Sequence, residues 1–467
     1  MELPTTRTLT SVLIATAVFA ASCSSAAEDF STTAPADSSA DGFVEVAASS
    51  GFFDSSIVHD LAIDFDEDDY AEMVTTFEVD GDKEWIEATV TIDGTVFENA
   101  GVRLKGNSSL RGLTLQTAEN PEELPWLIKL DKYVDDQDYE GIHDIVIRSN
   151  STETSLNEAV AQGLLAITGL AAEDPAATVF TVNESEAQLR LAIEHPDEIW
   201  EDENFDTDNG ALYKADSTGD YSYRGDEWDA YDDVFDQKVG EDDLDPLISF
   251  LDFINNADDE TFANELGELL DVESFATYLA FQDLVQNGDD IDGRGNNSYL
   301  HYDYETERFT VVSWDLNLAF NTANVSTGAN AGGGQFGQGG RPDRGNIDHA
   351  SAERGFPTDG GRPEQRVIPG QIDRDPEASA NTPTTRQGNL VGAGSTNVLS
   401  GRFLANATFA ALYDQAVADL TEMLFASGVA DDLVSHWTEL LALHAGDLVT
   451  ITTIDNDAAA ITGTFPI

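Results

Sequence analysis

The pattern of apolar and polar positions divides the chain into a strand-rich first half and a helix-rich second half. Val90–Ile92 and Thr95–Phe97 flank Asp93-Gly94, a dipeptide typical of a tight hairpin turn. After the hairpin, apolar residues recur at helical spacing between Thr154 and Ile167, following a Thr/Ser start, and predict a helix. Further short strands are expected at 101–104, 127–130, 145–147, 179–182 and 189–193.

From about Asp242 the pattern becomes helical. Helices are expected at 247–254, 262–270 and 272–285, and two more segments at about 405–427 and 430–450. A pair of strands, 298–302 and 309–313, interrupts them. The predicted fold is therefore α+β with two lobes, a strand-rich N-terminal lobe and a helical C-terminal lobe.

Two segments lack any pattern of burial. Residues 23–50 are rich in Ser, Ala, Thr and Asp and predict a flexible stalk, and residues 322–397 are rich in Gly, Pro, Asn, Gln and Arg and predict a disordered insertion. Seven arginines lie in that insertion, which either folds back over an acidic body or is a solvated linker. The folded domain is expected to comprise 51–321 and 398–450.

The N-terminus has the features of an export signal. A short apolar run from Leu9 to Ala21 follows Arg7, and small residues directly precede Cys23, the only cysteine of the chain. We predict a signal peptide over 1–22 and a lipid on Cys23 that holds the protein on the outer face of the cell membrane. The alternative is an ordinary secretory signal that releases the protein.

The formal net charge of −67 limits the partners. The chain has 22 Lys plus Arg against 89 Asp plus Glu, so nucleic acid and anionic lipid are not expected to bind, and membrane contact is expected through the lipid anchor only. Seven histidines without paired spacing, and a single cysteine, argue against a zinc site. No Gly-x-Ser-x-Gly sequence supports a serine hydrolase.

Two segments of the strand-rich half carry unusual cations. The segment Gly101–Ser109 runs from a strand with two cations into Gly-Asn-Ser-Ser, which either holds phosphate oxygens or is a plain β-turn. Lys129 lies within an apolar strand. It either packs its stem on the sheet or pairs with Glu158 on the following helix, as a strand lysine and a helix glutamate do in kinases.

The most informative segment is Asn287–Leu300, followed by the strand that ends at Trp314-Asp315. The order of parts is that of a kinase catalytic centre: an aspartate, a loop, an asparagine leading into a strand, and a second strand that ends in an aspartate. A calcium loop is the competing interpretation, although the spacing departs from the EF-hand pattern. Calcium could also bind Asp64–Asp69, but acids ahead of Tyr70 favour a helix N-terminus.

Taken together, these segments resemble the CotH (spore coat protein H) kinase family. The resemblance extends from about residue 55 to 450. The matching residues are Gly101–Ser109, Pro125–Lys132, Gly210–Lys214, Asp289–Leu300 and Trp314–Asn317.

The resemblance implies an exported, atypical protein-kinase-like fold that moves the γ-phosphoryl group of ATP to a protein hydroxyl. Asp290 is implied as the catalytic aspartate, with Asp289 as its rival. Asp315 is implied as the ligand of Mg²⁺, or of Mn²⁺ in its place, assisted by Asn296 or Asn297. The implied nucleotide-binding residues are Arg103, Lys105, Asn107, Ser108, Lys129, Glu158 and Lys214.

Two departures from the family affect these expectations. Asn317 stands where many members carry a further aspartate, and the long insertion directly follows the metal-binding strand. Two functions therefore remain open. The first is a surface-anchored kinase that modifies Ser/Thr hydroxyls of envelope or surface proteins. The second is a non-catalytic surface or envelope assembly protein with the same fold, able to bind calcium.

Overall fold

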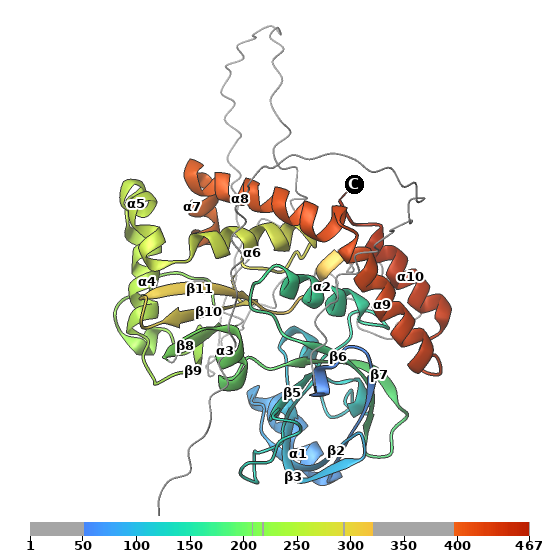
Figure 1. Ribbon diagram of the computed structural model, residues 1–467. Coiled ribbons are helices and arrows are strands. Elements are labelled where there is room, and N and C mark those ends of the chain that lie inside the picture. Colours follow the sequence, from blue (N-terminus) through green and yellow to red (C-terminus); the bar gives the residue numbers. More distant parts are fainter. Residues whose placement is uncertain (1–50, 208, 217–218, 293–294, 321–396, 467) are drawn as a thin grey trace, which may run out of the picture. The chain divides into compact units, whose positions relative to one another are not determined.

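The computed structural model describes residues 51–207, 209–216, 219–292, 295–320 and 397–466, all of which belong to one compact unit, Val46–Ile467 (Figure 1). Within these residues, no helix has both the length and the apolar character required to cross a bilayer. The predicted signal peptide, Cys23, the stalk and the insertion lie outside the described residues, except Asn397, the last residue of the insertion.

A closed barrel forms the strand-rich part. Its strands follow the order β1-β2-β3-β4-β5-β7-β6, and β1 closes the ring by pairing in parallel with β6. Helix α1 (Glu67–Asp80) connects β1 to β2, and α2 (Leu156–Ile167) connects β5 to β6. The strands are β1 (Val58–Phe65), β2 (Ile86–Ile92), β3 (Thr95–Leu104), β4 (Trp126–Lys129), β5 (Asp144–Ile147), β6 (Pro175–Val182) and β7 (Gln188–Glu194).

Alternation along the barrel strands sorts their side chains between two environments. Val102, Ile128 and Ile145 face the barrel core, whereas Leu127 and Val146 on the outer face join a second core that contains α2. Since successive side chains of a strand point to opposite faces, polar residues two positions away from Leu127 or Val146 on the same strand share that outer face. The register accordingly aligns Arg103 opposite Leu127 on β3 and β4, and Lys129 opposite Asp144 on β4 and β5.

A second, four-stranded sheet has the order β11-β10-β8-β9. Its strands are β8 (Gly210–Ala215), β9 (Phe235–Val239), β10 (Ser298–Asp303) and β11 (Arg308–Ser313). One face packs on helices, with Tyr213 and Leu300 in their common core. The other face contributes Leu212 and Tyr299 to the core that contains α2, so Lys214, in step with Leu212, lies on the face that packs toward the barrel.

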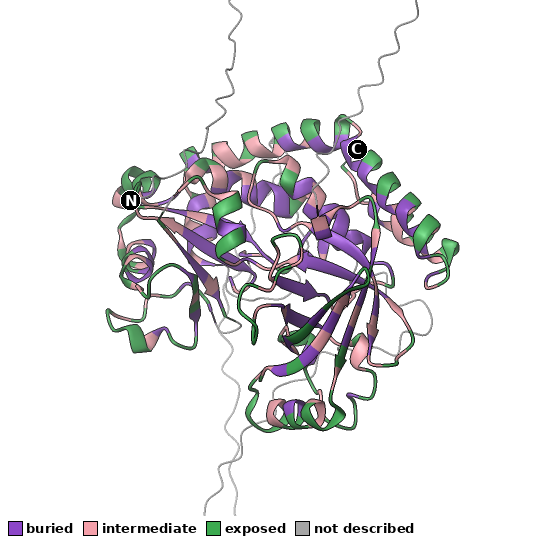
Figure 2. Cartoon of the chain, turned by 60° about the horizontal axis from the view of Figure 1, so that its bottom comes forward, coloured by how far each residue is buried: buried purple, intermediate pink, exposed green. Residues whose placement is uncertain are grey.

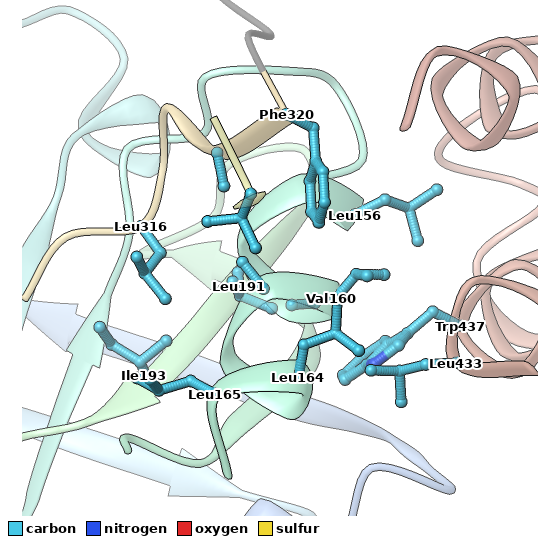
Figure 3. Close-up of a cluster of buried hydrophobic side chains, with 14 of the residues drawn as sticks. Leu156, Val160, Leu164, Leu165, Leu191, Ile193, Leu316, Phe320, Leu433 and Trp437 are labelled. Carbon is cyan, nitrogen blue, oxygen red and sulfur yellow. The ribbon is translucent and has the colours of Figure 1, made fainter. Parts of the chain in front are cut away.

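Helices cover the second sheet and enclose α2 (Figures 1 and 2). The remaining helices are α3 (Glu198–Asn204), α4 (Asp245–Asn256), α5 (Asp259–Leu269), α6 (Val272–Leu284), α7 (Val398–Ala405), α8 (Ala407–Leu420), α9 (Val429–His444) and α10 (Ile451–Thr462), with a π-helical turn at Thr421–Ala426. Figure 3 shows the apolar side of α2 between Leu191 and Ile193 of β7, and Leu433 and Trp437 of α9. Helix α2 is therefore fixed between two layers.

The strand-rich N-terminal part and the helical C-terminal part confirm the predicted α+β class. The hairpin forms at Asp93-Gly94, and Asp66 caps α1 by accepting a hydrogen bond from the Asp68 N–H, as the helix interpretation of that acidic run requires. The helix expected over 430–450 is present but shorter than predicted. Helix α9 ends at His444, and Thr450 caps a new helix, α10, through the N–H of Thr453.

Candidate active site

All six lysines of this acidic chain lie around one region of the fold. Lys105 is electrostatically coupled to Lys214 and Lys238, and Lys83 is coupled to Lys238. Lys132 and Arg103 both lie over the Trp85 ring, 5.2 and 4.7 Å from its centroid. We define the basic cluster as Lys83, Arg103, Lys105, Lys129, Lys132, Arg148, Lys214 and Lys238.

Trp314 lies at the centre of this cluster. Its ring centroid is 5.2 Å from the ammonium of Lys105, 5.8 Å from the guanidinium of Arg148 and 6.0 Å from the ammonium of Lys214. Tyr299 packs edge-on against the same ring at 5.5 Å. The negative face of an indole attracts cations, so one buried aromatic side chain helps three like charges to lie close together.

Lys105 has the least favourable charge in the cluster. Burial, together with the charges of Lys238, Arg103, Lys214 and Arg148, lowers the pKa of Lys105 well below its ordinary value. The charged neighbours that perturb this ammonium most strongly are themselves cations. An anion of high charge would relieve this repulsion, so the cluster is suited to binding a polyphosphate.

Asp315 directly follows Trp314 and has an unusual backbone conformation. Its φ of 65° lies in the left-handed region, where a residue with a side chain is strained. Its Oδ1 accepts a hydrogen bond from Nη2 of Arg148. Arg148, 8% exposed, also pairs through Nε with Oε1 of Glu158 at 2.9 Å. Burial raises the pKa of Glu158, and the charge of Arg148 opposes this rise.

The predicted pairing of Lys129 with Glu158 is therefore wrong. Lys129 Nζ lies 3.0 Å from Asp131 Oδ1 and 3.0 Å from Asp144 Oδ1. The reason is register, because Lys129 and Asp144 are directly opposite each other on β4 and β5. Glu158 on α2 instead meets Arg148, which follows the end of β5.

Asp144 also accepts a hydrogen bond from His195, with 3.0 Å between Oδ2 and Nδ1. Burial and the charge of Lys105 lower the pKa of His195 to about 4, so the imidazole is neutral at pH 7. Single atoms of Asp144, His195 and Asp197 lie within 4.8 Å of one another and could hold a metal ion. However, Lys129 already neutralises Asp144, and Asp197 caps α3 through the N–H groups of Ile199 and Trp200.

The loop after α6 contains the predicted catalytic aspartates. Burial and the charge of Asp292 raise the pKa of Asp290 to about 7, whereas Asp289 is exposed and its carbonyl accepts a hydrogen bond from Asn297 Nδ2 at 2.9 Å. Lys214 donates to the carbonyl of Asn296 at 2.5 Å and is coupled electrostatically to Asp315. These contacts connect the loop to the basic cluster.

A buried hydrogen-bond network fixes this loop relative to Asp315. Gln282 of α6 donates to Ser313 Oγ at 2.9 Å, and its own side-chain oxygen accepts from Asn287 Nδ2 at 2.9 Å. Ser313 lies two residues before Asp315, and Asn287 lies three residues before Asp290. The network thus fixes the start of the loop after α6, at Asn287, against the end of β11.

Two predicted phosphate ligands lie at the edge of this arrangement. Asn107 and Ser108 are exposed and begin a short 3-10 turn, Ser108–Leu110, directly after Lys105 and Gly106. Gly106 has a φ of 104°, a conformation that favours glycine, and so allows the chain to turn at this point. Arg103 and Lys105 belong to the basic cluster, and the structure gives no contact that tests Asn107 or Ser108 as ligands.

Five residues of the site escaped the sequence analysis: Lys83, Asp144, Arg148, His195 and Lys238. Asp144 is the first residue of β5 and Arg148 directly follows its last, so charges at both ends of a buried strand were a usable signal. Lys238 lies on β9, an edge strand with the polar sequence FDQKV, which carries no clear apolar pattern. His195 directly follows β7, and nothing in its local sequence distinguishes it from the other histidines.

Comparison with known proteins agrees with the motifs. The family model described as CotH kinase protein matches residues 102–453. This range includes the loop after α6, Asp315 and every residue of the basic cluster other than Lys83. No curated protein matches the chain. The match covers most of the sequence, so this chain belongs to the CotH kinase family.

Proposed function

We propose that this protein is a phosphotransferase that transfers the γ-phosphoryl group of ATP to Ser or Thr hydroxyls of proteins. The observation that carries this proposal is the basic cluster around Trp314 and Asp315, in a CotH kinase family member whose formal net charge is −67. Lys129 and Arg148 already pair with carboxylates, but the charges that most perturb Lys105 are those of four other cations. They suit a ligand with several phosphate groups.

The residues present fit ATP and a divalent metal. Arg103 and Lys105 are the proposed phosphate ligands, because the charges that surround Lys105 call for an anion. Asp315, with the amide oxygens of Asn296 and Asn297, offers the hard oxygen donors that Mg²⁺ prefers, and Mn²⁺ accepts the same set. When bound, the metal would neutralise phosphate charge. The proposed role of Lys214 is to hold the Asn296 backbone, to which it donates.

Asp290 is the proposed proton acceptor for the substrate hydroxyl. Its pKa of about 7, raised by burial and by the charge of Asp292, suits a group that takes up a proton near neutral pH. Its Oδ1 accepts a hydrogen bond from the N–H of Asp292, which orients the carboxylate within the loop. Asp289 is the weaker candidate, because it is exposed and its backbone already serves to bind Asn297.

We further propose that the protein works outside the cytoplasm, held to the cell membrane by a lipid on Cys23. The support is the N-terminal sequence alone: an apolar run followed by small residues before the only cysteine. In that place the substrates would be proteins of the envelope or the cell surface. Labelling with a radioactive fatty acid, compared between the wild type and Cys23→Ala, tests the anchor. Equal labelling of both would refute it.

The catalytic proposal is tested with [γ-³²P]ATP and Mg²⁺ or Mn²⁺, using the mature protein and a generic basic protein substrate. We expect Asp290→Ala and Asp315→Ala each to lower incorporation by about 10² to 10⁴-fold. Asp414→Ala, an exposed position on α8, is the matched control and should retain full incorporation. Equal incorporation by all variants, or none by the wild type, would exclude the proposed activity and leave the non-catalytic assembly function.

A further inference from the structure

We propose that Arg148 is a positioning residue for the metal ligand Asp315, and that Glu158 on α2 holds Arg148 for this task. The inference rests on the proposed function, because it assigns a role to residues behind the proposed metal site. It concerns a residue that the sequence motifs did not indicate. Three observations support it: the ion-pair chain itself, the strained backbone of Asp315, and the way α2 is held.

The ion-pair chain runs from α2 to the metal ligand through a single guanidinium. Arg148 contacts Glu158 through Nε, with 2.9 Å to Oε1 and 3.1 Å to Oε2, and contacts Asp315 through Nη2. Glu158 is 2% exposed. An arginine presents its donors in a rigid planar fork, so fixing Nε on Glu158 fixes the direction in which Nη2 meets Asp315.

The backbone of Asp315 needs such support. A φ of 65° at a residue other than glycine costs roughly 1–3 kcal/mol and persists only where the surroundings determine it. The surroundings here include the carbonyl of Asn317, which accepts hydrogen bonds from Ser151 Oγ at 2.7 Å and from Asn157 Nδ2 at 2.6 Å. Arg148 supplies the corresponding contact to the Asp315 side chain.

Helix α2 provides a rigid base for this arrangement. It carries both Asn157 and Glu158, and its apolar side is buried between β7 and α9, as Figure 3 shows. The backbone of Arg148 is fixed as well, because Nε of Arg190 donates a hydrogen bond to the Arg148 carbonyl at 3.0 Å. The contact that holds the Asp315 carboxylate thus comes from a buried arginine that is itself fixed by Glu158 and Arg190.

The charge of Arg148 raises an opposing possibility, that it repels the metal ion. Its charge is offset by Glu158 on one side and Asp315 on the other. Partners that orient a ligating carboxylate increase metal affinity, and their loss typically lowers it 10- to 100-fold. Positioning should therefore outweigh repulsion.

The test measures Mn²⁺ binding to the full chain without nucleotide, by the loss of the electron paramagnetic resonance signal of free Mn²⁺. Surface carboxylates also bind this ion, so the relevant binding is that of the wild type minus that of Asp315→Ala. We expect Arg148→Gln to lower the affinity of this site by about 10- to 100-fold. Arg148→Lys should restore part of the loss, because lysine keeps the charge but not the fork.

Two further variants secure the result. Arg224→Gln, which removes an exposed pair with Asp220, is the matched control and should bind Mn²⁺ like the wild type. Arg148→Gln leaves Glu158 buried without its cation and can destabilise the fold, so Arg148→Gln/Glu158→Gln, which replaces both charges by amides, is measured beside it. A thermal melt by circular dichroism confirms that each variant is folded.

Each outcome is decisive for one of the two proposals. Unchanged or tighter Mn²⁺ binding by folded Arg148→Gln and folded Arg148→Gln/Glu158→Gln would overturn the positioning role, as would a wild type that binds no more Mn²⁺ than Asp315→Ala. If the wild type transfers no phosphate but the Arg148 variants still weaken the Asp315 site, the proposed function fails and the positioning role stands.

Discussion

Glu173 is a buried carboxyl group close to the site, with 1% of its surface exposed. Its Oε2 accepts a hydrogen bond from Gln162 Nε2 at 2.6 Å, one helical turn beyond Glu158 on α2. Burial raises the pKa of Glu173 to about 8, so this carboxyl is largely protonated at neutral pH. An acid kept neutral in this way makes stability depend on pH.

The sign of that dependence follows from the raised pKa. The stabilisation is present below the unfolded-state pKa, 4.5, and is lost as pH rises toward about 8. We expect Glu173→Gln, which is permanently neutral, to raise the free energy of unfolding by about 2 kcal/mol at pH 8 and by much less at pH 5. Urea unfolding at both values measures this difference. An equal effect at pH 5 and pH 8 would contradict it.

Glu439→Gln is the control for this measurement. Glu439 is exposed on α9, so its replacement should change the free energy of unfolding by less than ~0.5 kcal/mol at either pH. If the free energy of unfolding of this variant rose by a similar, pH-dependent amount, the effect would be due to the loss of any negative charge. The comparison therefore separates burial of one carboxyl from the general acidity of the chain.

Individual residues also show what the sequence could predict. The Asp66 cap and the Asp93-Gly94 turn were predicted correctly, because each depends on contacts within a few residues. The partner of Lys129 was not, because it depends on which residue of β5 lies opposite β4. Asp289, Asp290, Asn296, Asn297, Lys214 and Asp315 lie in one connected region, although the roles assigned to them remain predictions.

At the scale of elements, the site depends on how α6, the loop after it and β11 are joined. The Gln282 side chain connects Ser313 of β11 to Asn287 at the start of the loop. Both partners are buried, so removing the amide leaves their polar groups without this hydrogen bond. The pattern of apolar residues could predict α6 and β11, but not that a glutamine would couple them.

We expect Gln282→Leu to lower the free energy of unfolding by about 1–3 kcal/mol. We also expect it to lower the rate of phosphotransfer by more than the loss of folded protein accounts for. The reason is that the loop bearing Asp290 would no longer be fixed against the strand bearing Asp315. Initial rates and urea unfolding, both at 25 °C, provide the measurement. Gln415→Leu, an exposed glutamine on α8, is the control and should leave both quantities near the wild type. Wild-type rates and stability in Gln282→Leu would refute the coupling.

At the scale of the whole molecule, the dominant fact is the imbalance between 89 acidic and 22 basic residues. Like charges repel within a folded chain, and dissolved salt screens the repulsion over about 10 Å at 0.1 M and about 3 Å at 1 M. The basic cluster has the opposite sign, so the same salt weakens its attraction for phosphate. Stability and ligand binding should therefore respond to salt in opposite directions.

We expect the melting temperature to rise between 0.05 and 1 M NaCl, while the affinity for ATP falls over the same range. Differential scanning calorimetry measures the first quantity, and fluorescence titration with a labelled ATP analogue measures the second. Chloride is preferred to sulfate, which stabilises proteins by exclusion from their surface. A melting temperature that is constant or falls with NaCl would show that self-repulsion does not limit this fold.

The position of all six lysines around the basic cluster has a practical consequence for handling the protein. Apart from the chain terminus, the side chains that react with amine-directed reagents are those of the basic cluster, which includes the proposed phosphate ligand Lys105. Biotinylation, fluorescent labelling or coupling to an activated resin through amines will therefore modify the site itself. For the same reason, a ligand that occupies the site should shield most of the chain's amines at once, so the extent of labelling becomes a direct readout of occupancy.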